Sequence, residues 1–310
     1  MSDVSEDPTG WPSLVLDDWK DTYATVHLWT QMLGKTRVGL SPAQNHSWHT
    51  ALYLTARGLT TGPMPSGAKM VESELDFVAD RLRVTRSDGL TVEAPLRDCS
   101  VAEMYADYLG LLRETEVEAR IWGMPVEIPD AIPFRTDEVH CSYDGDAMRR
   151  GWRALLATER VLQRFRTGFV GKCSPVHFWW GAFDIAHTRF SGRTAPEHPG
   201  GMPNLADRIA RDAYSHECMS VGWWPGNPGG PVDEAAFYAY AYPEPPGFAD
   251  APVRPEAASY HTVLREWVLP YEAVRAASDP DQVLETFCRD VFDAAASLGK
   301  WDRSALERAG

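Results

Sequence analysis

The chain has 310 residues and 44% hydrophobic side chains, a length that allows one large domain or two ordinary ones. Its 44 acidic and 30 basic residues give a formal charge of −14, which excludes the basic face needed to bind a nucleic-acid backbone. No apolar run approaches the ~20 residues of a membrane span, the acidic N-terminus is unlike a signal peptide, and the five cysteines lack CxxC spacing, so we expect a cytoplasmic protein with reduced thiols.

The clearest local signal in the first half is the spacing of Ser100 and Glu103, which is typical of a capping box at the start of a helix. Gly and Pro interrupt the surrounding segments every few residues, which favours short strands joined by turns. In chain order the sequence predicts a helix over 21–35 that ends at Gly34, strands over 48–57, 69–86 and 90–96, the capped helix over 101–115, a short strand over 119–122 and a connector over 124–134.

The second half ends in the most strongly predicted helix. Asp279 is a suitable N-cap, Pro280 occupies the first helical position, and an apolar stripe follows from Leu284 to Leu298. Before it the sequence predicts a helix over 147–169, strands near 177–189, 216–223 and 236–242, and a proline-rich loop over 243–255.

The two halves also share a weak repeat. Gly-Lys, then Ser-Pro, then His-x-Trp occur from residue 34 to residue 48 and again from residue 171 to residue 179. The repeat predicts an α+β fold of two similar antiparallel lobes, with helices packed on the sheets and His46 and His177 at equivalent positions beside a pseudo-twofold axis. We expect an acidic tail at 1–18, a first lobe at 19–134 and a second lobe at 135–310, packed as one unit.

Five long segments, at 19–35, 45–62, 169–193, 213–226 and 237–248, carry a resemblance to a known family. Together they make the chain, from Trp11 to about Leu306, resemble the family called domain of unknown function 5996. The resemblance implies a soluble protein of about this length, and it implies no established reaction.

Histidine is the commonest metal ligand and titrates near neutral pH. His46, His177 and His216 lie within the densest motifs, so they are candidate ligands for a divalent metal such as Fe, Zn or Mn. The alternative is that these histidines are hydrogen-bonded within a Trp-rich core.

Asp184 lies between aromatic and aliphatic residues, where a carboxylate is either paired or has a raised pKa, so it is a candidate general base. His216 and Glu217 are further candidate catalytic residues, with Glu217 as the partner of a buried cation. Glu72, Glu74 and Asp76 alternate along one strand and predict either a metal-binding face or a solvated sheet face.

Several aromatic and basic residues complete the candidate site. Trp48 and Trp179 are expected to form the wall of a pocket, and Lys172 or Arg189 to hold an anionic group. Tyr240 shares a strand face with Tyr238 and Tyr242, which predicts phenols directed into a polar cavity or a half-exposed Tyr-rich surface.

The sequence contains no GxGxxG, GxxxxGK[ST], HExxH or GxSxG motif, so no nucleotide cofactor is expected. We expect an enzyme that acts on a small polar or aromatic molecule in a cleft between the lobes, as a metal-dependent oxidoreductase or, less favoured, a hydrolase. The alternatives are a non-catalytic binding protein with an aromatic-lined cavity and a homo-oligomeric structural protein. The expected partner is a small molecule, without nucleic acid or membrane.

Overall fold

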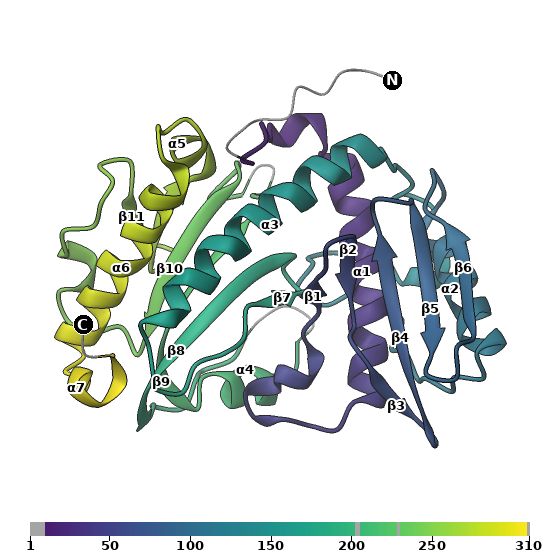
Figure 1. Cartoon of the computed structure of the whole chain (residues 1–310), viewed down its shortest axis with the longest axis horizontal. Helices are drawn as coiled ribbons and strands as arrows, with labels where there is room; N and C mark the ends of the chain where they lie inside the picture. The colour runs from purple at the N-terminus through teal and green to yellow at the C-terminus, as the bar shows by residue number, and fades with distance from the viewer. Residues whose placement is uncertain (1–9, 202–204, 228–229, 309–310) are drawn as a thin grey trace.

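Two antiparallel sheets form the framework of the protein (Figure 1). The computed structural model describes residues 10–201, 205–227 and 230–308. The first sheet has the order β1-β2-β4-β5-β6, with β3 paired to β4, and the second has the order β11-β12-β10-β9-β8-β7. The first-sheet strands are β1 Tyr53–Leu54, β2 Gly58–Thr60, β3 Met64–Ser66, β4 Lys69–Asp76, β5 Arg81–Arg86 and β6 Thr91–Pro95. The second-sheet strands are β7 His177–Trp179, β8 Asp184–Thr194, β9 His216–Trp224, β10 Ala236–Tyr242, β11 Ser259–His261 and β12 Glu266–Pro270.

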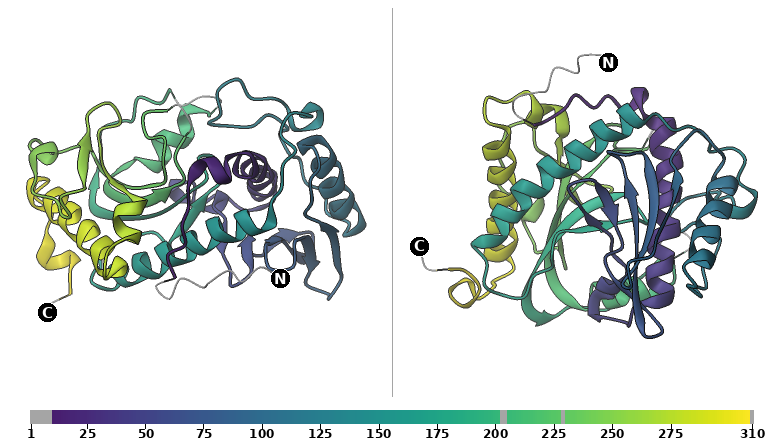
Figure 2. Two further views of the ribbon diagram at one scale, coloured as in Figure 1. Left: turned by 90° about the horizontal axis from the view of Figure 1, so that it is seen from above. Right: turned by 45° about the vertical axis from the view of Figure 1, so that its right-hand side comes forward.

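Helices cover one face of each sheet, so the predicted α+β class is confirmed. α1 and α2 contact the first sheet, whereas α3, α5 and α6 contact the second, with α3 crossing it diagonally (Figures 1 and 2). None of the described helices is long and apolar enough to span a membrane. The α-helices are α1 Lys20–Leu40, α2 Val101–Glu114, α3 Gly145–Thr167, α4 Asp207–Ala213, α5 Tyr271–Arg275, α6 Pro280–Leu298 and α7 Arg303–Leu306. Short 3-10 turns are η1 Leu16–Asp18, η2 Asn45–Thr50, η3 Phe134–Thr136 and η4 Phe248–Asp250.

α1 is a central helix that lies between the two sheets (Figure 1). Every residue from Thr25 to Arg37 is buried, so this stretch of the helix has no solvent face and no amphipathic stripe. The predicted end at Gly34 is wrong, because the helix continues to Leu40. Gly34 serves another purpose: a Cβ there would lie 2.2 Å from the Trp180 ring, so only glycine lets Trp180 pack directly on the helix.

Elements with strong local signals follow the prediction. Ser100 and Glu103 form a capping box at the start of α2. The Asp279 side chain accepts a hydrogen bond from the Gln282 N–H at the start of α6, and Pro280 is the first helical residue. β10 has the predicted limits.

Two predicted strands are wrong. Within the segment 48–57, residues 48–50 belong to the 3-10 turn η2 and only Tyr53 and Leu54 form a strand, β1. Just before it, His46 and Ser47 adopt left-handed φ angles of 58° and 57° that turn the chain. Residues 119–122 form no strand, since the first sheet ends at β6.

The predicted duplication is not confirmed. Gly34 and Lys35 lie inside α1, whereas Gly171 and Lys172 lie in a bend before β7. His46 lies in the turn η2, whereas His177 begins β7. The two sheets also differ in strand order. They are joined at Leu52 and Phe178, whose backbones exchange two hydrogen bonds of 2.9 Å, and one continuous hydrophobic core extends through both.

The first residues described belong to the body of the protein, although a tail was predicted at 1–18, of which residues 1–9 lie outside the described residues. Trp11 is fully buried, and its ring lies 5.9 Å from that of Phe237 and 5.8 Å from that of Tyr271. Its Nε1 donates to Asp281 at 2.8 Å. The segment that precedes α1 is therefore packed against the second sheet and α6.

Candidate functional site

The face of the second sheet that α3 and α6 leave uncovered carries the candidate site. Tyr238 of β10 pairs with Gly222 of β9, and Gly222 pairs with Ala186 of β8. Because side chains two residues apart on a strand point to the same face, Asp184 shares the face of Ala186, and Tyr240 shares the face of Tyr238. Carboxyl groups from the connector and β12 and a phenol from the end of α4 join them. We call this set the acid–tyrosine face: Glu127, Asp184, Tyr214, Tyr238, Tyr240 and Glu266.

Asp184 is the buried centre of the acid–tyrosine face. It is only 7% exposed, and its carboxylate accepts a hydrogen bond from the hydroxyl of Tyr238. Burial raises the pKa of Asp184 to about 7, and the charge of Glu127 adds to the rise while the Tyr238 hydrogen bond opposes it. The sequence-based interpretation of Asp184 as a buried carboxyl group with a raised pKa is in agreement with this geometry.

A glycine makes this hydrogen bond possible. Tyr238 is on β10 and Asp184 is on β8, so the phenol must lie across β9, the strand between them. It crosses at Gly222, where an added Cβ would lie 2.6 Å from the Tyr238 ring and 2.4 Å from the Ile185 carbonyl oxygen. Sequence reasoning missed Gly222, although the glycine stands out within a buried strand as a point of close approach.

The acid–tyrosine face lacks positive charge. None of the three carboxyl groups Glu127, Asp184 and Glu266 is paired with a Lys, Arg or His in the part of the chain that the structure describes. Burial raises the pKa of Glu266 to about 7 and also raises the pKa of Glu127. Glu127 and Glu266 were not predicted from the sequence, because nothing in their neighbourhoods indicates that they approach Asp184.

The tyrosines link the acidic groups into a polar surface. The hydroxyl groups of Tyr214 and Tyr240 lie 2.8 Å apart, and Tyr240 stacks on Tyr238 with ring centroids 6.2 Å apart. Tyr240 and Tyr238 are half-buried, and burial raises the pKa of both phenols well above the ordinary value. Trp179 lies directly opposite Asp184 in the β7–β8 pair.

Predicted residues gather in a second group at the other end of β8. His46 stacks on Phe190 at 4.6 Å, and its ring lies 5.6 Å from that of His216 and 5.4 Å from that of Trp48. Lys172 donates to His46 Nε2 at 2.9 Å, while His46 Nδ1 lies 3.2 Å from the Asp212 carbonyl oxygen. Both nitrogens of His46 are therefore engaged, and burial and the Lys172 charge lower its pKa.

His177 lies beside this group but is separated from His46 by Trp48. Its ring centroid is 5.7 Å from that of Trp48 and 5.0 Å from that of Trp179. It is 1% exposed, neither ring nitrogen has a hydrogen-bond partner within the described ranges, and burial lowers its pKa to about 3. His177 is thus a neutral imidazole enclosed by aromatic rings.

The predicted metal ligands His46, His177 and His216 do not converge. Within residues 10–201, 205–227 and 230–308, no group of three or more His, Cys, Asp or Glu side chains is placed to hold a metal ion. The structure brings His46 close to His216 and leaves His177 behind Trp48.

Two predicted residues have structural partners away from Asp184. Arg189 points to the opposite face of the second sheet, where its guanidinium lies 3.5 Å from the centroid of Phe165 and 4.3 Å from that of Phe292. It therefore cannot hold a ligand on the Asp184 side. Glu217 accepts hydrogen bonds from Arg193 at 2.6 Å and from Ser191 at 2.9 Å, so its partner is a cation, although Arg193 is exposed and not buried as predicted.

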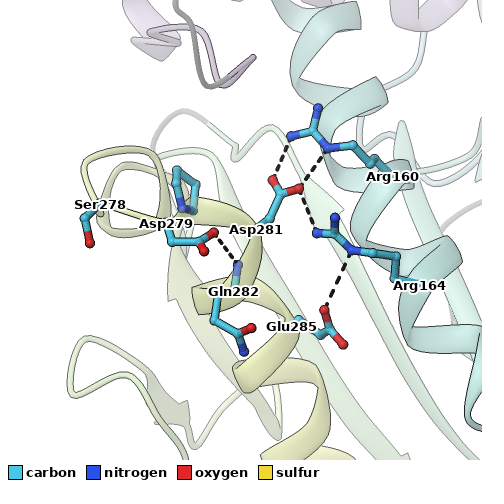
Figure 3. A pocket seen from close by; sticks show the side chains of 8 residues that line it. Arg160, Arg164, Ser278, Asp279, Asp281, Gln282 and Glu285 are labelled. Carbon is cyan, nitrogen blue, oxygen red and sulfur yellow. Dashed lines mark hydrogen bonds and ion pairs between the residues drawn. The ribbon is translucent and has the colours of Figure 1, made fainter.

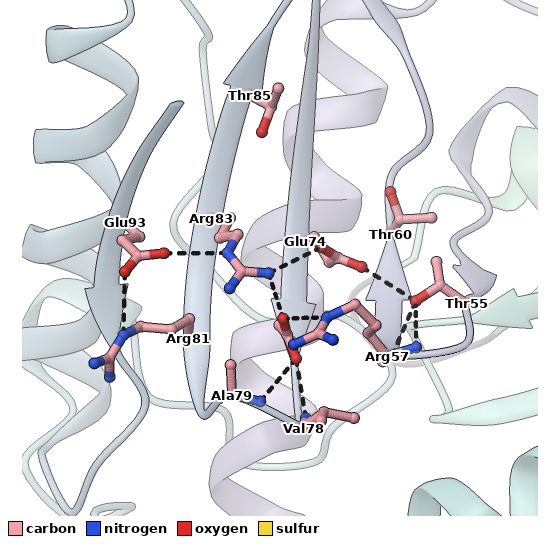
Figure 4. A network of polar contacts seen from close by, with 12 residues as sticks. Thr55, Arg57, Thr60, Glu74, Val78, Ala79, Arg81, Arg83, Thr85 and Glu93 are labelled. Atoms are coloured by element: carbon pink, nitrogen blue, oxygen red, sulfur yellow. Dashed lines mark hydrogen bonds and ion pairs between the residues drawn. The ribbon is translucent and has the colours of Figure 1, made fainter. Parts of the chain in front are cut away.

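The alternating acidic residues of β4 form an ion-pair network on the outer face of the first sheet (Figure 4). Arg83 contacts both Glu74 and Asp76, and Arg57 donates to Asp76 at 2.7 Å. Thr60 donates to Glu72 at 2.5 Å. Arginines neutralise Glu74 and Asp76, and Glu72 accepts a hydrogen bond from a threonine hydroxyl, which favours the sheet-face interpretation over a metal-binding one.

Two surface depressions lie away from the acid–tyrosine face. One, of about 690 Å³, is lined by Arg160 and Arg164 of α3 and by Asp281 of α6, which form ion pairs of 2.7 Å (Figure 3). The other, of about 510 Å³, lies between the end of β10 and the C-terminal end of α6 and includes Glu217. In the first depression, the ion pairs of Arg160 and Arg164 with Asp281 connect α3 to α6.

Comparisons with known proteins bear on the family and not on the reaction. The model of a family described as a family of unknown function, DUF5996, matches residues 11–308. Neither the comparison with curated proteins nor that with solved structures found a match. From Trp11 to Arg308, the match includes both sheets and every residue of the acid–tyrosine face, and the chain belongs to this family of unknown function.

Proposed function

We propose that this protein is an enzyme that binds a small amine on the acid–tyrosine face and acts on it by general acid–base chemistry, with Asp184 as the proton-accepting group. The observation that carries the proposal is the state of Asp184: a buried carboxyl group with one phenolic donor and no basic partner in the described chain. A buried carboxylate is ordinarily paired, so an unpaired one is a candidate functional group.

The charge of the surroundings determines the class of ligand. Three carboxyl groups without a cationic partner among the described residues favour a ligand that carries positive charge, and the faces of Trp179 and the tyrosines suit an organic cation. The expectation of an anionic ligand held by Lys172 or Arg189 is not part of this proposal, since Lys172 is bound to His46 and Arg189 lies on the opposite face.

The pKa of Asp184 suits proton transfer at neutral pH. A carboxyl group with a pKa of about 7 is present in both protonation states there, so it can accept a proton and return it. The Tyr238 hydroxyl donates to the ionised form and orients it. In this proposal Asp184 takes a proton from the bound ammonium group or from an adjacent C–H bond, and Tyr238 holds the carboxylate in place.

The predicted metal and redox chemistry is not carried into the proposal. His46 already donates through one nitrogen and accepts through the other, and three donor side chains do not meet within the described residues. The proposed acid–base chemistry therefore uses the side chains of the acid–tyrosine face, which the fold brings together.

The first test compares two ligands that share a ring and differ in charge. Benzylamine is expected to raise the melting temperature of the protein at pH 7 by about 2 °C or more at saturation, while benzoate leaves it unchanged. Asp184→Asn and Tyr238→Phe are expected to abolish the shift. Tyr242→Phe is the matched control, because the Tyr242 hydroxyl binds the Pro196 carbonyl oxygen instead. Equal shifts from benzylamine and benzoate would contradict the proposal.

The second test separates an enzyme from a binding protein. Amines that bind are incubated with the protein in D₂O and followed by NMR for deuterium exchange or chemical conversion. The wild type is expected to change at least one of them, and Asp184→Asn to be slower by about 100-fold or more. Binding of an amine without deuterium exchange or chemical conversion would contradict the proposed enzymatic activity. It would favour a non-catalytic amine-binding protein, which the unpaired acids and stacked tyrosines also support.

A further inference from the structure

Lys35 differs from the other four lysines of the chain. Lys20 and Lys69 form ion pairs with Asp17 and Asp88 at 2.8 and 2.9 Å, Lys172 donates to His46, and Lys300 is exposed. Lys35 lies in the last third of the central helix α1 and is only 5% exposed. Burial of a lysine is costly unless its charge is paired, so its surroundings are informative.

Two indole rings enclose the amine of Lys35. Its Nζ lies 4.7 Å from the ring centroid of Trp122 and 5.5 Å from that of Trp180. The described part of the chain gives this amine no ion pair and no hydrogen bond. Trp180 packs on α1 at Gly34, the residue before Lys35, because the missing Cβ of this glycine makes room for the ring.

These surroundings increase the share of Lys35 that is present as neutral amine. Burial lowers the pKa of Lys35 to about 8, and no carboxylate opposes the effect. At pH 7.5 such a lysine has about a hundred times more free amine than an ordinary lysine with a pKa near 10.4. The free amine is the nucleophilic form, and lysines desolvated in apolar surroundings are the ones that form Schiff bases.

We propose that Lys35 is a reactive amine that condenses with a small uncharged aldehyde or ketone seated between Trp122 and Trp180. The lone pair of Nζ attacks the carbonyl carbon to form a C–N bond, and the resulting carbinolamine loses its oxygen as water. Both nitrogen protons leave with that oxygen, so the products are one imine and one water. No oxidant or reductant is required.

The access route and the ligand class follow from the same residues. Trp122 is 59% exposed and belongs to a segment without regular secondary structure between α2 and η3, so one of the two rings beside the amine lies at the surface, on the side from which we propose that the small molecule enters. A charged carbonyl compound would find no counter-ion among the described neighbours of the Lys35 amine, which are the rings of Trp122 and Trp180. This site is independent of the acid–tyrosine face.

The test labels the wild-type protein with benzaldehyde and sodium cyanoborohydride, which reduces an imine to a stable secondary amine. Peptide mapping then gives the rate of labelling at each of the five lysines in one experiment. At pH 7.5 we expect Lys35 to be labelled at least about tenfold faster than Lys300.

Lys300 is the matched internal control, because it is exposed and shares every condition with Lys35. In the chain unfolded by urea, the five lysines are expected to react with benzaldehyde at similar rates. Labelling of Lys35 no faster than Lys300 in the folded protein would overturn the proposal. Selective labelling that persists in urea would overturn it as well, since the selectivity would then not come from the fold.

Discussion

Asp76 of the first sheet and Asp184 of the second are both buried carboxyl groups on antiparallel strands, and their partners differ. Asp76 receives hydrogen bonds from Arg57 and Arg83 and from the backbone N–H groups of Val78 and Ala79 at 3.0 and 2.9 Å (Figure 4). Asp184 receives one side-chain hydrogen bond, from Tyr238.

The pKa values of the two groups shift in opposite directions. Burial alone would raise the pKa of Asp76, but the hydrogen bonds from Arg57 and Ala79 and the charge of Arg83 lower it below its ordinary value. For Asp184 the effect of burial is dominant. The comparison teaches that burial by itself does not mark a functional carboxylate. What distinguishes Asp184 is that the fold buries it without supplying a cation.

Replacing the neutralised carboxylate is expected to have the largest effect on stability. Asp76→Asn leaves Arg57 and Arg83 without their shared anion, so the free energy of unfolding should fall by about 3–5 kcal/mol. Urea unfolding at pH 7 measures the change. Glu93→Gln, which removes a half-exposed partner of the same Arg83, is the control and should cost less than about 1 kcal/mol. A loss of similar size in both variants would show that Asp76 is not the centre of the network.

Replacing the unneutralised carboxylate should stabilise the protein. The folded-state pKa of Asp184, about 7, is raised above the unfolded value of 3.8, so the protonated group contributes stability below pH 4 that is lost as pH rises through 7. Asp184→Asn removes this loss and should be more stable than wild type by about 2–4 kcal/mol at pH 8, with a smaller difference at pH 5. Urea unfolding of both proteins from pH 5 to pH 8 measures this difference in the free energy of unfolding. A difference that does not change with pH would refute the unpaired state of Asp184.

A smaller effect on stability tests the side-chain hydrogen bond that Asp184 accepts from Tyr238. Gly222→Ala places a methyl group 2.6 Å from the Tyr238 ring, so the phenol must move and the free energy of unfolding should fall by about 1–3 kcal/mol. Gly110→Ala in α2 is the control, because its new Cβ meets no atom within 4 Å, and it should stabilise by up to about 1 kcal/mol. Gly222→Ala with wild-type stability would indicate that Tyr238 does not need to cross β9 at that point.

The candidate site was only partly predictable. The burial of Asp184 and the shared face of Tyr238 and Tyr240 follow from neighbouring residues and from the alternation of a strand. The approach of Glu127 and Glu266 joins segments more than 50 residues from Asp184, and no local pattern encodes it. The orientation of Arg189 was also missed, although it follows from the same alternation: Arg189 is five residues from Asp184 and therefore faces the other way.

The sequence by itself determined the elements whose signals are local. These elements are the capping box of α2, the Asp279–Pro280 start of α6 and the limits of β10. Each depends on residues close together in the sequence, so the interactions that stabilise it form regardless of how the rest of the chain is arranged. Tertiary structure decided the rest. Gly34 lies inside α1, where its missing Cβ makes room for the ring of Trp180, and Asp76 and Asp184 differ because the arginines that neutralise Asp76 have no counterpart among the described neighbours of Asp184. Charge pairing depends on distance in space, and residues far apart in the chain set that distance only after folding.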